Sequence, residues 1–95
     1  MPAYLIAEHQ ITDTARFEEY RRRVVPMIEQ FGGRYVTRAG SHNILDGTWH
    51  PDRVVIIEFP DMGALNAWYR SPEYQPLIAL RRSAGIDVLI AIEGS

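Results

Sequence analysis

The chain is predicted to form one α+β domain with the element order β-α-β-β-α-β, in which an antiparallel four-stranded sheet carries its helices on one face. Three observations support this prediction. Segments near both ends of the chain alternate in polarity, a segment between them repeats at three- and four-residue steps, and glycine or proline separates most segments. The length of 95 residues fits a single domain, residues 1–95, and leaves no room for a second.

The first third of the chain predicts a strand followed by a helix. Residues 4–11 alternate as a strand with two different faces requires. Apolar side chains recur at helical spacing over residues 17–31, with Asp13 placed to cap the beginning and the glycine pair 32–33 to mark the end. Pro26 lies inside this helix, and we expect it to bend the helix rather than to break it.

The middle of the chain predicts two further strands. The first is expected over residues 34–39, with a short extension through residues 43–45. A loop rich in turn residues follows. Residues 53–59 are the most β-branched run in the sequence, and we expect them to form a central strand.

The last third predicts two short helices and a final strand. Asp61 is placed to cap the first helix. The segment Ser71-Pro72-Glu73 supplies a cap, a proline and an acid in the order that a second helix start prefers. Residues 86–93 then alternate again as a strand.

One face of this sheet would be left bare. This order of elements is the ferredoxin-like arrangement, whose helices all cover the same face. Val54 and Ile56 nevertheless lie on one side of the central strand while further apolar residues lie on the other. The bare face would expose several hundred square ångströms of apolar surface, which is at the limit for a monomer. A second copy stacked sheet to sheet is the simplest cover, so we expect a homodimer.

Composition excludes several classes of function. A net charge of −2 supplies no broad basic surface, so nucleic acid is not an expected partner. With no cysteine, the chain can form no disulfide, thiolate zinc site or iron–sulfur cluster. The three histidines are too scattered to predict a metal site, and we expect no cofactor. The amino terminus resembles neither a signal peptide nor a membrane span, so we expect a cytoplasmic protein without a membrane partner.

Four strings of the sequence are similar to a bacterial domain-of-unknown-function family within the dimeric α+β barrel superfamily. They are GGR at residues 32–34, LDGTW at 45–49, VVIIEFP at 54–60 and AWYRSPEYQ at 67–75. The resemblance spans nearly the whole chain. It implies a dimer whose two sheets form a barrel-like core, with a pocket between each sheet and its helices. It implies no reaction, because the superfamily includes cofactor-independent monooxygenases, isomerases and haem-binding proteins.

Two residues are candidates for proton transfer. Glu58 interrupts the apolar central strand, where a buried carboxylate must be paired, hydrogen-bonded or protonated. The alternative is an ion pair with an arginine such as Arg34 or Arg81. His9 lies near the end of the first strand and is of the residue type best suited to exchange protons near neutral pH. The alternative for His9 is an ordinary histidine at a strand end.

Aromatic and arginine side chains are the candidates for ligand binding. Flat rings suit a planar organic ligand, and guanidinium groups bind carboxylates in a planar fork. The alternatives are core packing for the aromatic residues, which we prefer for Trp68, and solvated or paired arginines. The candidates are Tyr20, Arg34, Trp49, Tyr69, Tyr74 and Arg81. Arg53 is a further arginine that could bind a carboxylate in the same way.

Two functions therefore stay open. One is a cofactor-independent enzyme that acts on a small organic molecule through carboxylate acid–base chemistry. In that case a cavity should be lined by Glu58 together with Arg81 or one of the candidate tyrosines. The other is a non-catalytic homodimer with a ligand-binding or purely structural role.

Overall fold

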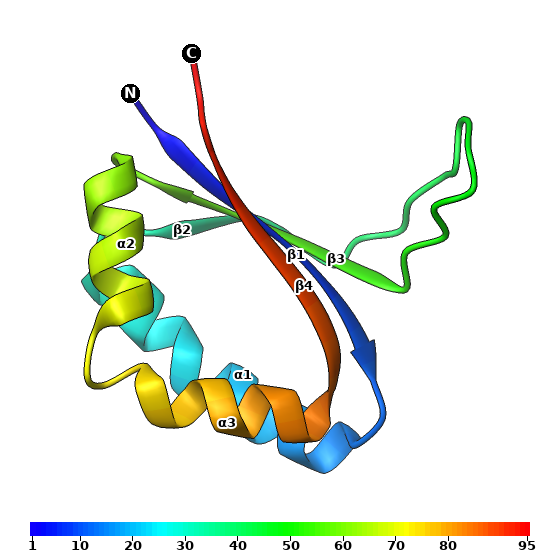
Figure 1. Cartoon of the computed structure of the whole chain (residues 1–95), viewed down its shortest axis with the longest axis horizontal. Coiled ribbons are helices and arrows are strands. Elements are labelled where there is room, and N and C mark those ends of the chain that lie inside the picture. Colours follow the sequence, from blue (N-terminus) through cyan, green and yellow to red (C-terminus); the bar gives the residue numbers. More distant parts are fainter.

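The elements follow one another in the predicted order (Figure 1). The structure is a computed structural model, and it describes all of residues 1–95. The last helical segment is divided into two helices, as the sequence predicts. The elements are β1 (Ala3–Ile11), α1 (Thr14–Gln30), β2 (Arg34–Arg38), β3 (Arg53–Phe59), α2 (Met62–Arg70), α3 (Gln75–Ala84) and β4 (Gly85–Glu93).

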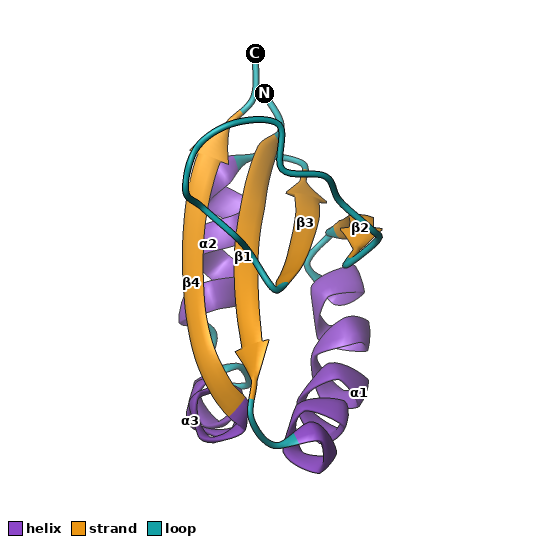
Figure 2. Cartoon of the chain, turned by 90° about the vertical axis from the view of Figure 1, so that its right-hand side faces the viewer, coloured by secondary structure: helices purple, strands orange, loops and turns teal.

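The four strands form one sheet in the order β2-β3-β1-β4, and every neighbouring pair is antiparallel. All three helices lie on the same side of this sheet (Figures 1 and 2). The fold is therefore the ferredoxin-like α+β arrangement. A long loop between β2 and β3 extends away from the sheet on the side without helices (Figure 1).

Local interactions explain where the helices begin and end. The carboxylate of Asp13 accepts a hydrogen bond from the backbone N–H of Arg16 at 3.0 Å, and Asp61 caps α2 in the same way. Gly32 follows α1 with a φ of +83°, a left-handed conformation that favours glycine. The helix α1 continues through Pro26 as one element, so the proline does not break it.

Two local predictions are wrong. Residues 43–45 form no strand, because they lie in the projecting loop, where no neighbouring strand offers backbone partners. Ser71-Pro72-Glu73 forms a turn, and α3 begins only at Gln75. The hydroxyl of Ser71 donates to the carbonyl of Trp68 at 2.8 Å and accepts from the backbone N–H of Tyr74 at 3.3 Å, so Ser71 closes α2 and caps the turn that precedes α3.

The core lies between the helices and the inner face of the sheet, and it follows the strand alternation. Ala3, Leu5 and Ala7 of β1 are buried, whereas the residues between them are only half-buried. Trp68 of α2 is 1% exposed and stacks on Phe59, with 5.6 Å between the ring centres. Its interpretation as a core residue is therefore confirmed.

The opposite face of the sheet is apolar and uncovered. Four isoleucine and valine side chains of β4 are between 51% and 65% exposed, which is unusual for residues of this type in a folded strand. They are Ile86, Val88, Ile90 and Ile92. The predicted bare face is thus present in the single chain.

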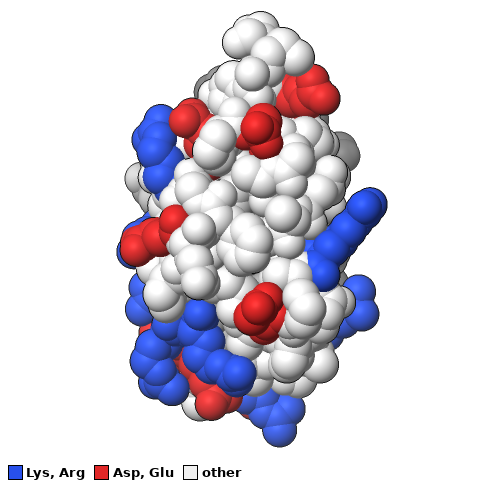
Figure 3. All heavy atoms as spheres, turned by 90° about the vertical axis from the view of Figure 1, so that its left-hand side faces the viewer, with Lys and Arg blue, Asp and Glu red and all other residues white.

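Charged side chains are mixed in sign on the face that Figure 3 displays. Arginines gather toward the lower end of this view, acidic side chains lie among and above them, and much of the surface is uncharged. Part of the positive charge on α1 is neutralised locally, since Arg21 and Glu18 form an ion pair at 2.8 Å. This face carries no broad basic surface of the kind that binds nucleic acid.

A substitution at Gly85 tests how closely the junction between α3 and β4 packs against β1. A Cβ atom at this position would lie 2.1 Å from the backbone carbonyl oxygen of Gln10, and backbone cannot swing aside as a side chain can. We therefore expect Gly85→Ala to lower the free energy of unfolding by about 1–3 kcal/mol, measured by urea denaturation. Gly40→Ala is the control, because its Cβ would meet only an ordinary contact at 3.5 Å. Equal stability of the two variants would contradict this reading of the junction.

Candidate functional site

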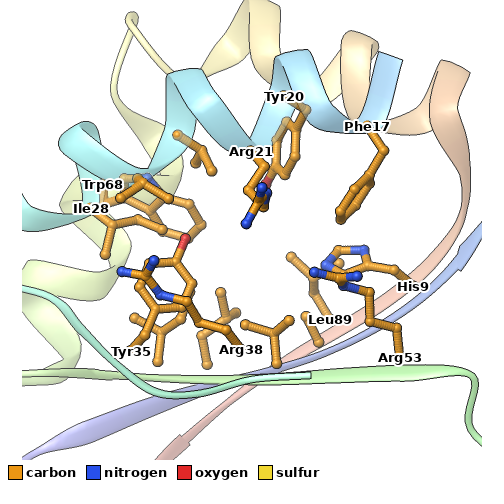
Figure 4. Close-up of a pocket in the computed structure, with 16 residues that line it drawn as sticks. His9, Phe17, Tyr20, Arg21, Ile28, Tyr35, Arg38, Arg53, Trp68 and Leu89 are labelled. Carbon is orange, nitrogen blue, oxygen red and sulfur yellow. The ribbon is translucent and has the colours of Figure 1, made fainter. Parts of the chain in front are cut away.

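A small cavity lies between α1 and the inner face of the sheet (Figure 4). Its volume is about 40 Å³, and 16 residues line it, 12 of them hydrophobic. The sheet supplies an apolar floor that includes Leu5, Val55 and Ile57, and α1 supplies the opposite wall with Phe17 and Tyr20. The cavity occupies the place that the resemblance implied, between the sheet and the helices.

His9 and Asp87 form a buried pair at the wall of this cavity. They are directly opposite each other in the β1–β4 register, and their side chains are only 7% and 6% exposed. The Nδ1 atom of His9 lies 2.5 Å from a carboxylate oxygen of Asp87. Because the carboxylate can only accept, this bond places the proton of a neutral imidazole on Nδ1 and leaves the lone pair on Nε2. His9 also packs edge-on against Phe17, with 5.1 Å between the ring centres.

The pair continues into a chain of buried hydrogen bonds. The second carboxylate oxygen of Asp87 accepts from Nε of Arg81 at 3.0 Å. Nη1 of Arg81 donates to the hydroxyl of Tyr74 at 2.8 Å, and that hydroxyl lies 2.8 Å from the hydroxyl of Tyr20. Asp87 thus has one partner on each oxygen, and its bond with the Arg81 guanidinium is charge-assisted. The arrangement fixes the orientation of the His9 ring.

The tyrosines of the site stay protonated at neutral pH. Burial raises the pKa of Tyr20 well above its usual value, with a further contribution from Tyr74, and burial also raises the pKa of Tyr74. Tyr35, which lines the cavity from β2, has its pKa raised to about 12 by burial. These phenols can therefore donate hydrogen bonds but do not supply negative charge near the cavity.

Arginines form most of the polar lining. Arg53 is the direct neighbour of His9 in the β1–β3 register, and its guanidinium lies 5.3 Å from the centre of the Phe17 ring. The guanidinium of Arg38 lies 4.4 Å from the centre of the Tyr35 ring. The third arginine of the lining is Arg21 of α1. The lining contains no aspartate or glutamate.

Glu58 does not line the cavity, and that expectation is wrong. Strand alternation buries its neighbours Ile57 and Phe59 on the helix side and turns Glu58 toward the uncovered face. There its two carboxylate oxygens accept from Arg34 at 3.2 and 3.3 Å. The structure therefore agrees with the alternative interpretation of Glu58, an ion pair with Arg34.

The other predicted residues fall into three places. His9 and Tyr20 line the cavity. Tyr74 and Arg81 lie behind it in the hydrogen-bond chain, and Tyr69 packs against Tyr74 with 5.5 Å between the ring centres.

Trp49 lies in the loop and donates to Glu8 on the uncovered face at 3.2 Å. This bond lowers the pKa of Glu8. The structure thus separates Trp49, like Glu58, from the cavity.

Sequence reasoning named Arg53 among the arginines that could bind a carboxylate, and Arg53 does line the cavity. It missed Asp87 and the cavity arginines Arg21 and Arg38. Asp87 had a detectable signal, because it is a charged residue on the same side of the alternating strand as Leu89. Its pairing with His9 depends on which strands become neighbours.

No cluster of three or more His, Cys, Asp or Glu side chains is arranged to hold a metal ion. None of the helices combines the length and the apolar character that crossing a membrane requires. The candidate site is therefore built from the His9–Asp87 pair, the tyrosines and the arginines alone.

The chain matches a family described as a domain of unknown function, DUF1330, over residues 2–95. No curated protein matches it. Among solved structures, the RPA0582 protein of unknown function from Rhodopseudomonas palustris has a TM-score of 0.81 at 22% identity, covering 99% of this chain and 82% of that chain. SnoaB, a cofactor-independent oxygenase from Streptomyces nogalater, has a TM-score of 0.68 at 12% identity, covering 99% and 93%.

A dimeric ferredoxin-like protein of unknown function from Jannaschia sp. CCS1 has a TM-score of 0.65 at 10% identity, covering 99% of this chain and 100% of that chain. Identities this low establish a shared fold, and a shared fold does not specify a reaction.

Removing Arg81 should destabilise the protein strongly. Its side chain is 4% exposed, and its loss removes one of the two hydrogen-bond partners of the Asp87 carboxylate and one of the two of the Tyr74 hydroxyl. We expect Arg81→Met to cost about 3–5 kcal/mol of unfolding free energy, measured by urea denaturation. Arg82→Met is the matched control, because Arg82 is exposed and should change stability by less than about 0.5 kcal/mol. A small effect at Arg81 would contradict the importance of the hydrogen-bond chain.

Proposed function

This chain belongs to the DUF1330 family, a domain of unknown function, and from that premise we propose that it is a cofactor-independent enzyme that moves a proton on a small organic molecule. The proton acceptor is Nε2 of His9. One observation carries this proposal: His9 is held by a buried carboxylate at the wall of a cavity, and no protein group forms a hydrogen bond with its Nε2. His9 thereby takes the role that the sequence suggested for Glu58.

The chemistry follows from the geometry of the pair. A neutral imidazole with its lone pair on Nε2 can accept a proton from an enolisable carbon or a phenol in the cavity. The imidazolium that results is stabilised by the Asp87 carboxylate on its other nitrogen. General base catalysis of this kind contributes about 10²–10⁴-fold to a rate. The similarity in fold to SnoaB supports the proposal that no cofactor is needed.

A second function is favoured by the size of the cavity. A volume of about 40 Å³ holds no more than a few water molecules, so an organic substrate must displace side chains at the opening. Arg21 and Arg38 are exposed and able to move. If they do not open the cavity, the His9–Asp87–Arg81 cluster is a structural ion-pair network. The protein is then a homodimer with a non-catalytic role in binding or structure.

Proton transfer by His9 can be measured without knowing the natural substrate. The protein is incubated in D₂O with 2-oxobutanoate and with cyclohexanone, and deuterium incorporation next to the carbonyl is followed by NMR. We expect exchange above the buffer rate on at least one compound, and His9→Gln should slow it by about a hundredfold. His42→Gln, in the exposed loop, should keep the full rate. Equal exchange by the His9 variant would refute its role, and no exchange on either compound would favour the non-catalytic function.

We also propose that the uncovered sheet face joins two copies into a homodimer. The exposed side chains of β4 form an apolar strip that runs along the sheet, and Ile44, Leu45 and Trp49 of the projecting loop add further exposed apolar surface. A symmetric pairing would cover both strips at once. Nucleic acid and membranes have no part in this proposal.

Sedimentation at micromolar concentration tests the homodimer. We expect about twice the chain mass of 10.9 kDa for the protein and the single-chain mass for Ile90→Glu, because a buried unpaired carboxylate at each copy of the interface costs several kcal/mol. Gln30→Glu is the control, because it adds the same charge to an exposed position of α1. A monomeric wild-type protein would contradict the proposal, as would an Ile90→Glu variant that stays dimeric.

A further inference from the structure

Two arginines of the cavity have no acidic partner. The protein contains five ion pairs, and neither Arg38 nor Arg53 takes part in any of them. Each guanidinium lies instead against an aromatic ring, over Tyr35 and Phe17 respectively. The third arginine of the lining, Arg21, pairs with Glu18, so Arg38 and Arg53 carry the positive charge that no ion pair of the chain neutralises.

The strand register places Arg53 beside His9. Arg53 is directly opposite His9, and Arg38 is directly opposite Val55, which is the next residue of β3 on the same face. The two guanidinium groups point apart, because that of Arg53 lies beside the imidazole of His9 while that of Arg38 turns toward Tyr35 (Figure 4). An anion bound by Arg53 would therefore lie beside His9.

Two hydrogen-bond donors of the lining lack an acceptor. Nε of Arg53 and Nε1 of Trp68 are both buried and have no partner in the protein. Buried donors are usually satisfied, and each one left without a partner costs free energy. Arg53 and Trp68 lie toward opposite ends of the lining (Figure 4). A ligand oxygen beside Arg53 would supply an acceptor for its guanidinium, whereas the indole nitrogen of Trp68 is turned away from the cavity (Figure 4).

We propose that the cavity binds a small organic carboxylate, with the carboxylate on the guanidinium of Arg53. The inference rests on the proposed function, because it names the class of substrate for His9. The planar fork of a guanidinium matches a carboxylate in shape and charge. The apolar floor of the sheet then accommodates the body of the ligand, and the reacting hydrogen faces Nε2 of His9.

Binding is tested with 4-hydroxybenzoate and its neutral counterpart 4-hydroxybenzamide, which differ in charge but hardly in shape. The indole N–H signals of the two tryptophans are followed by NMR during each titration. We expect the carboxylate to shift the Trp68 signal and to bind at least about tenfold more tightly than the amide. The Trp49 signal serves as an internal control. Equal binding of both compounds, or no shift at Trp68, would overturn the proposal.

Variants locate the carboxylate. Arg53→Met should weaken binding of 4-hydroxybenzoate about 10- to 100-fold, the loss expected for a hydrogen-bonded charge. Arg38→Met is one control, because the Arg38 guanidinium turns toward Tyr35 and away from Arg53. Arg34→Met is a second control, because this arginine pairs with Glu58 on the other face. Unchanged binding in the Arg53 variant, or an equal loss in the Arg38 variant, would overturn the proposal.

The two proposals fail in different ways. Binding of 4-hydroxybenzoate without deuterium exchange on 2-oxobutanoate would contradict the role of His9 and leave the carboxylate site intact. Exchange that is as fast on neutral cyclohexanone as on 2-oxobutanoate would overturn the carboxylate site and leave the proton transfer by His9 intact.

Discussion

The alternation of side chains across the sheet is the constraint on which the rest of the structure depends. In β1, β3 and β4 the odd-numbered residues face the helices and the even-numbered residues face away. Both sets are largely apolar, so the same strands contribute to the core on one side and leave an exposed strip on the other. The residues that these three strands contribute to the site, His9, Arg53 and Asp87, all belong to the inner set.

The buried charges are stable only as a group. A carboxylate, an imidazole and a guanidinium in the interior would each be costly alone, because the charged forms lose their hydration. Here Asp87 links His9 to Arg81, and Arg81 links onward to a tyrosine hydroxyl. Arg53 forms no such ion pair, because its neighbours, His9 on β1 and Phe17 on α1, are aromatic rings without a carboxylate. The contrast between satisfied and unsatisfied cations distinguishes residues that hold the site from residues free to bind a ligand.

Much of the fold could be predicted from local pattern, because period-two alternation and helix caps are short-range properties. The central strand has the predicted bounds, and both aspartate caps were identified correctly. The start of α3 was not predicted correctly, because the sequence Ser71-Pro72-Glu73 taken alone is typical of a helix start. The site was harder to predict. Glu58 stood out as a polar residue in an apolar strand, yet its neighbours already placed it on the other face.

Asp87 became meaningful only once β4 was known to lie beside β1, which puts His9 opposite it at a separation of 78 residues. Sequence alternation specifies the face on which a side chain lies. It does not specify which strand lies alongside.

The junction between α3 and β4 affects the order in which the site can assemble during folding. No loop separates Ala84 from Gly85, so Arg81 and Asp87 are only six residues apart and can meet within one short stretch of chain. His9 must arrive from the opposite end of the polypeptide, which requires a much larger loss of chain entropy. The acidic and cationic half of the cluster is thus a local unit that can form early. The imidazole joins it only when the two terminal strands pair.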